Sequence, residues 1–300
     1  MDIKTLQLAE LESAAGLLHH VYERATETHG VTSPWPDVAA ARAYLERCRA
    51  RAGERVLLAE EGGAAVGIGV VRWRGESATL GPIASLIEGR GIGGALLEGL
   101  LSRAEDEGAA AQRVCVEAWN ASAYALFAGC GFGVIDTVAE IERPPAPGPT
   151  LEISRGLEVR AAEAGDLDGV MRLDHKLTGH ERSADLASLV QLVARRRGDV
   201  VAYLGMQSVE DAILLGPAVA VDASDLFTLL AHALGPSLAT ATGGAAEATL
   251  RARLSTNAPA AAMAALGVGF RVRSLGVVMS RGAPPPARPP QLYSLAPALL

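Results

Sequence analysis

Cysteine is scarce in this chain of 300 residues. Its three cysteines, Cys48, Cys115 and Cys130, form neither a CxxC pair nor a cluster with histidine. An odd count without such spacing excludes a disulfide framework and a zinc module, and it predicts a reducing compartment. We therefore expect a cytoplasmic protein without a metal site, held together by its hydrophobic core.

Basic charge and long apolar segments are also lacking. The 27 lysines and arginines are outnumbered by 34 acidic residues, and the formal net charge is −7. Sequence-independent binding of nucleic acid needs clustered basic residues, so that function is disfavoured. No apolar stretch reaches the roughly 18–20 residues of a membrane span, and no basic region followed by an apolar core opens the chain. These deficits predict a soluble protein with neither nucleic acid nor membrane as partner. Its oligomeric state, monomer or homodimer, is left open by the sequence.

What the chain does contain is material for two α/β domains, since 49% of its residues are hydrophobic. The proline-rich segment from Arg143 to Thr150 cannot continue a helix or enter the middle of a sheet. It reads as a stiff linker. We place a first domain over residues 1–143, a linker over 144–156 and a second domain over 157–300.

The two halves repeat each other at a nearly constant spacing. Residues 57–66 align with residues 192–201, and Leu80-Gly81-Pro82 aligns with Leu215-Gly216-Pro217 at the same offset. Three further residues have counterparts at a slightly larger offset: Asn120, Gly131 and Phe132, matched by Asn257, Gly269 and Phe270. Ordered matches of this kind favour two copies of one fold over chance similarity.

Periodicity and turn residues predict a mixed sheet in the first copy, with strands first and then a β–α–β–α–β arrangement. A hairpin is expected at Gly62-Gly63, and the tail 291–300 is expected to pack back as a strand. Helices are predicted over 11–24, 37–52, 92–106, about 120–130 and 167–177, and strands over 55–60, 65–73, 77–85, 113–117 and 132–141.

A glycine-rich turn follows a predicted strand and opens a predicted helix: Glu88-Gly89-Arg90-Gly91-Ile92-Gly93-Gly94. Glycine lets the backbone approach a ligand closely. The first N–H groups of a helix have no internal partner, and the helix dipole adds positive charge there. The turn is therefore a candidate site for phosphate groups.

Two nucleotide interpretations compete for this turn. Residues 89–94 satisfy the G-x-G-x-x-G fingerprint of dinucleotide-binding proteins, and Glu117 lies at the end of the next strand, where an acidic residue would meet a ribose hydroxyl. This would indicate an NAD(P)-dependent oxidoreductase. The hairpin strands ahead of the turn argue against it, because a Rossmann half is built from βαβαβ units.

The second interpretation rests on two motifs in order. The strand Leu80 to Ser85 leads into the turn, and Asn120-x-x-Ala123-x-x-x-Phe127-x-x-x-Gly131-Phe132 follows. These motifs resemble the GNAT superfamily of acyl-CoA-dependent N-acetyltransferases, in which a strand leads to (Gln/Arg)-x-x-Gly-x-(Gly/Ala) and later to Asn-x-x-Ala-x-x-x-Tyr-x-x-x-Gly-Phe. The resemblance implies an α/β (α+β) protein of two tandem folds, each a mixed, mostly antiparallel sheet flanked by helices.

The resemblance also implies acetyl-CoA as cofactor and names the residues that would bind it. The backbone of Ile83, Ala84 and Ser85 would pair with the pantetheine arm, and the amides of the turn would hold the pyrophosphate. The motif positions implied to bind the cofactor are Glu88, Gly89, Arg90, Gly91, Ile92, Gly93, Gly94, Asn120 and Phe127. Glu88 departs from the family's Gln or Arg, and Arg90 could compensate for its negative charge.

The catalytic positions depart further. In some members a Glu five residues before the motif Asn acts as base and a Tyr seven residues after it acts as acid; here these positions hold Cys115 and Phe127. A phenyl ring has no proton to give, and a buried thiol is a poor base. Glu117 shares a strand face with Cys115, and Tyr124 lies one turn before Phe127. We expect this displaced pair to act as base and acid, with a solvated Glu117 and a packed Tyr124 as the alternative.

The second copy lacks the glycine turn and has Asp222 and Asp225 at the corresponding helix start, where carboxylates would repel a pyrophosphate. We expect it not to bind CoA. The acceptor is expected to be a small-molecule or peptide amine, which the acidic balance of the chain suits. Candidate acceptor-binding residues are Tyr22, Trp35, His180 and Glu181, with core packing or a plain loop as the alternative. The competing function is a non-catalytic acyl-CoA-binding module.

Overall fold

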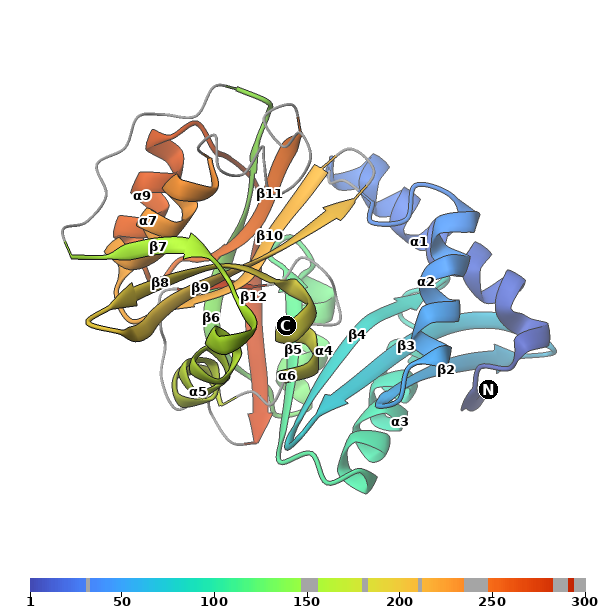
Figure 1. Ribbon diagram of the computed structural model, residues 1–300. Coiled ribbons are helices and arrows are strands. Elements are labelled where there is room, and N and C mark those ends of the chain that lie inside the picture. The colour runs from blue at the N-terminus through green and yellow to red at the C-terminus, as the bar shows by residue number, and fades with distance from the viewer. Residues whose placement is uncertain are drawn as a thin grey trace. The chain divides into compact units, whose positions relative to one another are not determined.

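The computed structural model of the protein describes residues 1–30, 33–146, 156–179, 183–209, 212–234, 248–282 and 291–293 (Figure 1). The chain divides into two units, one of Met1–Gly133 with Met279–Ala283 and one of Val134–Val278 with Pro284–Leu300. The first unit thus ends at Gly133, whereas the sequence places the first domain boundary after residue 143.

The first unit has the predicted order of elements. Its sheet runs β1-β2-β3-β4-β5, with the last residues of β12 (Arg271–Gly282) beyond β5. The elements are β1 (Asp2–Thr5), the 3-10 turn η1 (Leu8–Glu10), α1 (Leu11–His29), α2 (Val38–Ala50), β2 (Glu54–Glu61), β3 (Ala64–Arg74), β4 (Ser77–Ser85), α3 (Ile92–Asp106), β5 (Ala111–Glu117) and α4 (Ala121–Gly129). The helix predicted over 92–106 and the strand predicted over 77–85 match α3 and β4 residue for residue.

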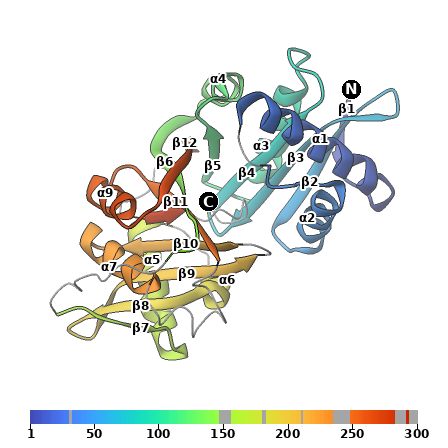
Figure 2. The same cartoon turned by 90° about the horizontal axis from the view of Figure 1, so that it is seen from above.

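Helices cover both faces of this sheet. Helices α1 and α2 pack on the face that carries Val56, Ile68 and Val70, and α3 lies on the opposite face (Figures 1 and 2). The α3 face of β3 carries Gly67 and Gly69, where an added Cβ would lie 2.6 Å from Ile92 and 2.8 Å from Leu100. The two glycines therefore let the start of α3 approach the sheet closely.

The second unit is built on an eight-stranded order, β12-β6-β11-β13-β10-β9-β8-β7. Its apolar core has one cluster against α7 and α9 and another against α5 and α6. The remaining bounds are β6 (Gly133–Arg143), β7 (Glu158–Ala161), the 3-10 turn η2 (Ala164–Asp166), α5 (Leu167–Thr178), α6 (Ser183–Leu189), β8 (Val190–Arg196), β9 (Asp199–Val209), β10 (Ala212–Ala220), α7 (Ala223–Ala233), β11 (Thr249–Ser255), α9 (Pro259–Gly267) and β13 (Gln291–Tyr293).

The repeat seen in the sequence is a repeat of structure. Strands β3 and β4 recur as β9 and β10 at one constant offset, and β5 and α4 recur as β11 and α9 at a slightly larger one. In each copy the fourth strand carries one extra residue against its neighbour, between Leu80 and Ile83 in β4 and between Leu215 and Ala218 in β10. This shared β-bulge fixes the alignment of the two copies strand by strand.

Strand β6 was expected in the first domain, and the strand itself is present. It pairs antiparallel with β11, from Arg143 opposite Leu250 to Val138 opposite Ser255. The last residues of β12, which follow the second copy in sequence, belong in turn to the first unit. Each unit thus contains a segment from the other half of the chain.

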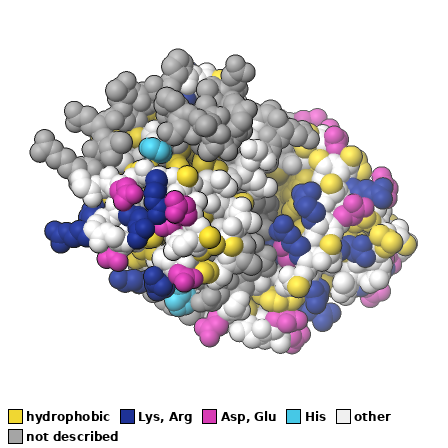
Figure 3. All heavy atoms as spheres, viewed as in Figure 1, with side chains coloured by type: hydrophobic (Ala, Val, Ile, Leu, Met, Phe, Trp, Pro, Cys, Tyr) yellow, Lys and Arg dark blue, Asp and Glu magenta, His cyan; other side chains and the backbone are white. Residues whose placement is uncertain are grey.

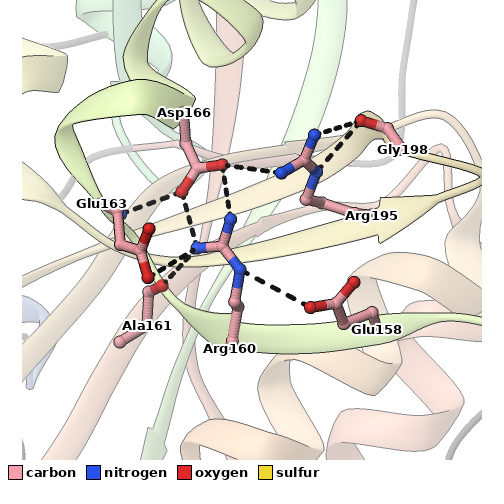
Figure 4. Close-up of polar contacts among 7 residues, drawn as sticks. All are labelled: Glu158, Arg160, Ala161, Glu163, Asp166, Arg195 and Gly198. Atoms are coloured by element: carbon pink, nitrogen blue, oxygen red, sulfur yellow. Dashed lines mark hydrogen bonds and ion pairs between the residues drawn. The ribbon is translucent and has the colours of Figure 1, made fainter.

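Each copy has a capping box at the 3-10 turn before its first α-helix. In the first, the carboxylate of Glu10 accepts from the backbone N–H of Gln7 at 2.8 Å and pairs with Lys4 at 2.6 Å. In the second, Asp166 takes the place of Glu10 and accepts from the N–H of Glu163 at 2.9 Å and from Arg160 at 2.7 and 2.8 Å. Figure 4 shows Arg160 and Arg195 approaching the same carboxylate. This capping box holds the first helix of each copy against its first strand.

Charge is distributed in small ion pairs of this kind. On the face drawn in Figure 3, basic and acidic side chains are interspersed over both units. Within the described residues, no helix combines the length and apolar character needed to cross a membrane.

Candidate functional site

Two adjacent strands of the first unit separate at the point where the sequence places the cofactor. Strands β4 and β5 pair in parallel from Ser77 opposite Ala111 to Thr79 opposite Arg113, and within these two fully described strands the pairing stops there. Figure 1 shows the ribbons diverging beyond this point. Ile83, Ala84 and Ser85 pair with β3 on one side only, so their other edge is open to an extended ligand.

The bulge of β4 lies at the start of this open edge. A buried arginine of β3 donates a hydrogen bond to its backbone. Arg72 on β3 is 1% exposed and donates to the carbonyl oxygen of Gly81 at 2.7 Å. Its guanidinium also approaches the carboxylate of Glu54 at 3.3 Å, with Glu54 2% exposed, and contacts Tyr44 and Cys48. Burial raises the pKa of Tyr44 well above its usual range and also raises the pKa of Cys48. Glu54 is therefore the anion that balances Arg72 within this group.

The glycine turn has the conformation that a phosphate site needs. Gly89 and Gly91 have left-handed φ values of 75° and 76°, and residues 87–91 are exposed. Gly91 caps α3 with no side-chain hydrogen bond, and the first turn of α3 contains no acidic residue. The N–H groups at this helix start are therefore left to a ligand.

Two side chains from other elements lie beside this turn: Leu126 of α4 and Glu61 of β2. An added Cβ at Gly93 would lie 3.4 Å from Leu126 of α4, so α4 packs beside the helix start. The guanidinium of Arg90, 54% exposed, pairs with the carboxylate of Glu61 at 3.1 Å. Glu88 is exposed. The turn thus offers one cation, already held near it by an exposed ion pair.

The residues predicted for catalysis lie around the end of β5. Cys115 and Glu117 are both half-buried, while Val114 and Val116 on either side of Cys115 are buried, so Cys115 and Glu117 share one face as expected. On α4, Tyr124 is 43% exposed, whereas Phe127 is 4% exposed and packs edge-on against Phe132. The side chain of Asn120 caps α4 by accepting from the N–H of Ala123 at 2.9 Å.

The residues predicted for the acceptor have different surroundings. Trp35 is 4% exposed and packs between Tyr22, at a ring distance of 4.7 Å, and Tyr44, at 5.0 Å. Its backbone oxygen contacts Nδ1 of His19 at 3.0 Å. Trp35 therefore occupies the core beneath α1 and α2, the alternative that its sequence context left open. His180 and Glu181 lie outside the described residues.

Sequence reasoning missed two features of this region. Arg72 could have been noticed as a charge within the apolar strand Val70-Val71-Arg72-Trp73. The second is a stack between His29, at the end of α1, and Trp119, just after Glu117, with ring centres 3.9 Å apart and planes 18° apart. No local pattern indicates this stack, because its members are far apart in sequence. It brings the end of α1 beside the end of β5.

The equivalent turn of the second copy is shorter and is filled by its own side chains. Leu86–Gly91 connects β4 to α3, whereas only Val221 and Asp222 connect β10 to α7. Asp225, in the first turn of α7, is 0% exposed and accepts from Arg196 at 2.6 Å. Burial raises the pKa of Asp225, and the charge of Arg196 opposes that shift. The start of α7 thus contains a carboxyl group of the chain itself, that of Asp225.

Comparison with known families finds one match. Residues 18–132 match the model of the acetyltransferase (GNAT) family. The matched segment contains the open edge of β4, the glycine turn, β5 and α4. Comparison with curated proteins finds no relative by sequence.

Solved structures resemble the chain over nearly its whole length. A GCN5-related N-acetyltransferase from Sphaerobacter thermophilus is 16% identical, with a TM-score of 0.68, over 94% of this chain and 95% of the other. A protein from Pyrococcus horikoshii provisionally described as an acetyltransferase is 16% identical, with a TM-score of 0.67, over 100% and 95%. A tandem GNAT protein from the clavulanic acid biosynthesis pathway is 17% identical, with a TM-score of 0.59, over 94% and 98%. At these identities the likeness establishes the tandem fold.

Proposed function

Because the first copy belongs to the acetyltransferase (GNAT) family and the chain is thus an acyltransferase, we propose that it transfers an acetyl group from acetyl-CoA to a primary amine. The acceptor is a small molecule or a peptide N-terminus, and the expected compartment is the cytoplasm. The observation that carries the proposal is the continuity of the open edge of β4 with the glycine turn. One extended ligand with a pyrophosphate in its middle can use both.

The residues present fit such a cofactor. The unpaired edge at Ile83–Ser85 offers backbone groups to the amides of a pantetheine arm, and the start of α3 offers N–H groups and a helix dipole to the pyrophosphate. Arg90 can exchange its exposed ion pair with Glu61 for a phosphate, since such a pair is weak. The repulsion expected from Glu88 is limited by its exposure to solvent.

Acetyl transfer from a thioester to an amine requires that the protein orient the two substrates and assist two proton transfers. The bound cofactor supplies an activated thioester. Glu117, directly or through a water, takes the proton that the amine loses as its nitrogen forms the new amide bond. Tyr124 gives a proton to the thiolate sulfur released from the broken C–S bond, because Phe127 at the family's acid position cannot. One amine and one thioester are consumed, and one amide and one thiol are formed.

Substitution at the glycine turn tests the cofactor site. Gly91→Glu places a carboxylate and a side chain at the helix start, and we expect it to weaken acetyl-CoA binding by more than about tenfold, or about 1.4 kcal/mol. Gly108→Glu is the matched control, because Gly108 has a φ of 79°, is exposed and follows the opposite end of the same helix. Thermal shift with acetyl-CoA, and with NAD as a comparison, measures the effect. An undiminished shift in the Gly91 variant would show that the cofactor binds elsewhere.

Release of free thiol with a panel of amines then separates an enzyme from a protein that only binds acyl-CoA. We expect amine-dependent release above the rate of hydrolysis for at least one class of amine. Binding without release for any primary amine would favour the non-catalytic function.

A further inference from the structure

Strands β10 and β11 of the second copy separate in the same way as β4 and β5. They pair in parallel from Ala212 opposite Thr249 to Leu215 opposite Ala252. In the alignment of the copies, Ala212 and Thr249 correspond to Ser77 and Ala111, which form the first pair of β4 and β5, so the register is the same. The second copy therefore has the strand arrangement that forms the open slot in the first.

This second slot contains a strand from the end of the chain. β13 pairs antiparallel with β10, where Ala218 faces Leu292 and Val219 faces Gln291. It also pairs antiparallel with β11, where Arg253 faces Tyr293 and Leu254 faces Leu292. The short segment Gln291–Tyr293 is thus bonded on both sides, between two strands that do not pair with each other at this level.

The alignment of the copies gives this placement its meaning. Ala218 and Val219 are the counterparts of Ile83 and Ala84, at the offset that relates β10 to β4. Those two residues form the open edge to which the proposed function assigns the pantetheine arm. A peptide strand and a pantetheine arm present the same groups to such an edge, namely secondary amides in an extended chain. The tail therefore takes the place of the cofactor arm.

The tail is also held by its side chain. Leu292 is 1% exposed and belongs to the same apolar cluster as Ala218 and Leu254. The two-residue connection to α7, with Asp225 buried beneath Arg196, leaves no glycine turn for a pyrophosphate at the end of this slot. The slot thus keeps the features that suit an amide chain and lacks those that suit a nucleotide.

We propose that the gap between β10 and β11 is a pantetheine-type slot that the chain's own tail, Gln291–Tyr293, occupies. Its ligand class is an extended chain of secondary amides without a nucleotide, and the tail fills it within the same molecule. The inference rests on the proposed cofactor slot of the first copy.

Hydrogen exchange read peptide by peptide on the full chain tests this. We expect Leu292→Asp to raise exchange at residues 218–220 and 253–254 at least tenfold by displacing β13, and to leave residues 83–85 unchanged. Leu266→Asp is the matched control, because Leu266 is 49% exposed on α9 of the same unit. Leu292→Ala serves if the charged variant does not fold.

Pantetheine is the probe for the vacated slot. Added at millimolar concentration, it should restore protection at residues 218–220 and 253–254 in the Leu292 variant and add none there in the wild type. Protection of the wild type at these residues by pantetheine would show that the tail does not fill the slot. Failure to protect the variant would show that the slot does not suit pantetheine.

The same measurement keeps the two proposals apart. Acetyl-CoA should protect residues 83–85 and 89–94 in every variant. Loss of that protection would contradict the proposed function, whatever happens at β13. Unchanged exchange at β10 and β11 in both Leu292 variants would overturn the tail's role while leaving the proposed function standing.

Discussion

At the scale of single residues, the proposed chemistry depends on Glu117 and Tyr124, which lie near the two positions where the GNAT resemblance implies a base and an acid. Phe127 lies at the position where the resemblance implies a tyrosine acid. It packs against Phe132 and has no proton to donate. Tyr124, one helical turn earlier, is 43% exposed. Cys115 has kept the place of the base, and Glu117 shares its face of β5. Glu117 and Tyr124 are therefore our candidates for the base and the acid.

Substitution of the displaced pair tests this arrangement. We expect Glu117→Gln and Tyr124→Phe each to lower kcat by about 10²-fold, the lower range of general acid–base catalysis, with little change in the KM for acetyl-CoA. Glu107→Gln, at an exposed carboxylate after α3, is the control. Steady-state rates provide the measurement. Wild-type turnover in both variants would refute the displaced pair and leave orientation as the source of catalysis.

At the scale of elements, local signals sufficed where a helix or strand is bounded by its own residues. The glycines before α3 and the turn at Gly62-Gly63 mark ends that no distant contact has to define. The partner of β6 could not be found in this way. Its alternation shows a strand, but its pairing with β11 depends on residues that lie far along the chain. The same holds for β13, whose sequence shows no sign of the slot that it enters.

The candidate site likewise has parts that the sequence predicts from local patterns and parts that depend on contacts between distant residues. The turn and the motif Asn120 are contiguous patterns, and the structure places both at helix starts. Arg72 behind the bulge and the stack of His29 on Trp119 are made by residues from separate elements. The acceptor residues were the hardest to predict, because Trp35 fits a core as well as a pocket until its neighbours are known.

The capping device of the second copy predicts a dependence of stability on pH. Hydrogen bonds from Arg160 lower the pKa of Asp166 below its ordinary value. A carboxylate whose pKa is lowered by folding stabilises the native state above its unfolded pKa of about 4, and this contribution is lost as the pH falls through the folded value. Asp166→Asn should therefore reduce thermal stability at pH 7, and the difference from wild type should shrink as the pH falls below about 4.

Asp168→Asn is the control for that measurement. Asp168 is exposed in the first turn of the same helix, so its loss removes a surface charge but not the cap. Melting temperatures of the three proteins across the pH range provide the comparison. A gap between Asp166→Asn and wild type that stays constant down to pH 2 would contradict the assignment.

At the scale of the whole molecule, two copies of one fold have diverged at the same two places. The first keeps an open edge on β4 and a six-residue connection, Leu86–Gly91, with left-handed glycines. The second has a strand on that edge and a two-residue connection with a buried aspartate. Either change alone would weaken a cofactor site. Because both occur in the same copy, the second copy keeps the fold but has neither of the two features on which the proposed cofactor site depends.

This divergence predicts that each chain binds one acetyl-CoA. Calorimetric titration should give a stoichiometry of one and a single affinity. In the second copy, β13 occupies the slot and the side chain of Asp225 lies at the helix start. Asp225→Asn should leave that stoichiometry at one, because removing the charge restores neither the glycine turn nor the open edge. Gly91→Glu should weaken this binding by more than about tenfold. Two sites per chain would mean that the second copy holds a cofactor in spite of its tail, and wild-type affinity in the Gly91 variant would mean that the cofactor does not use the glycine turn.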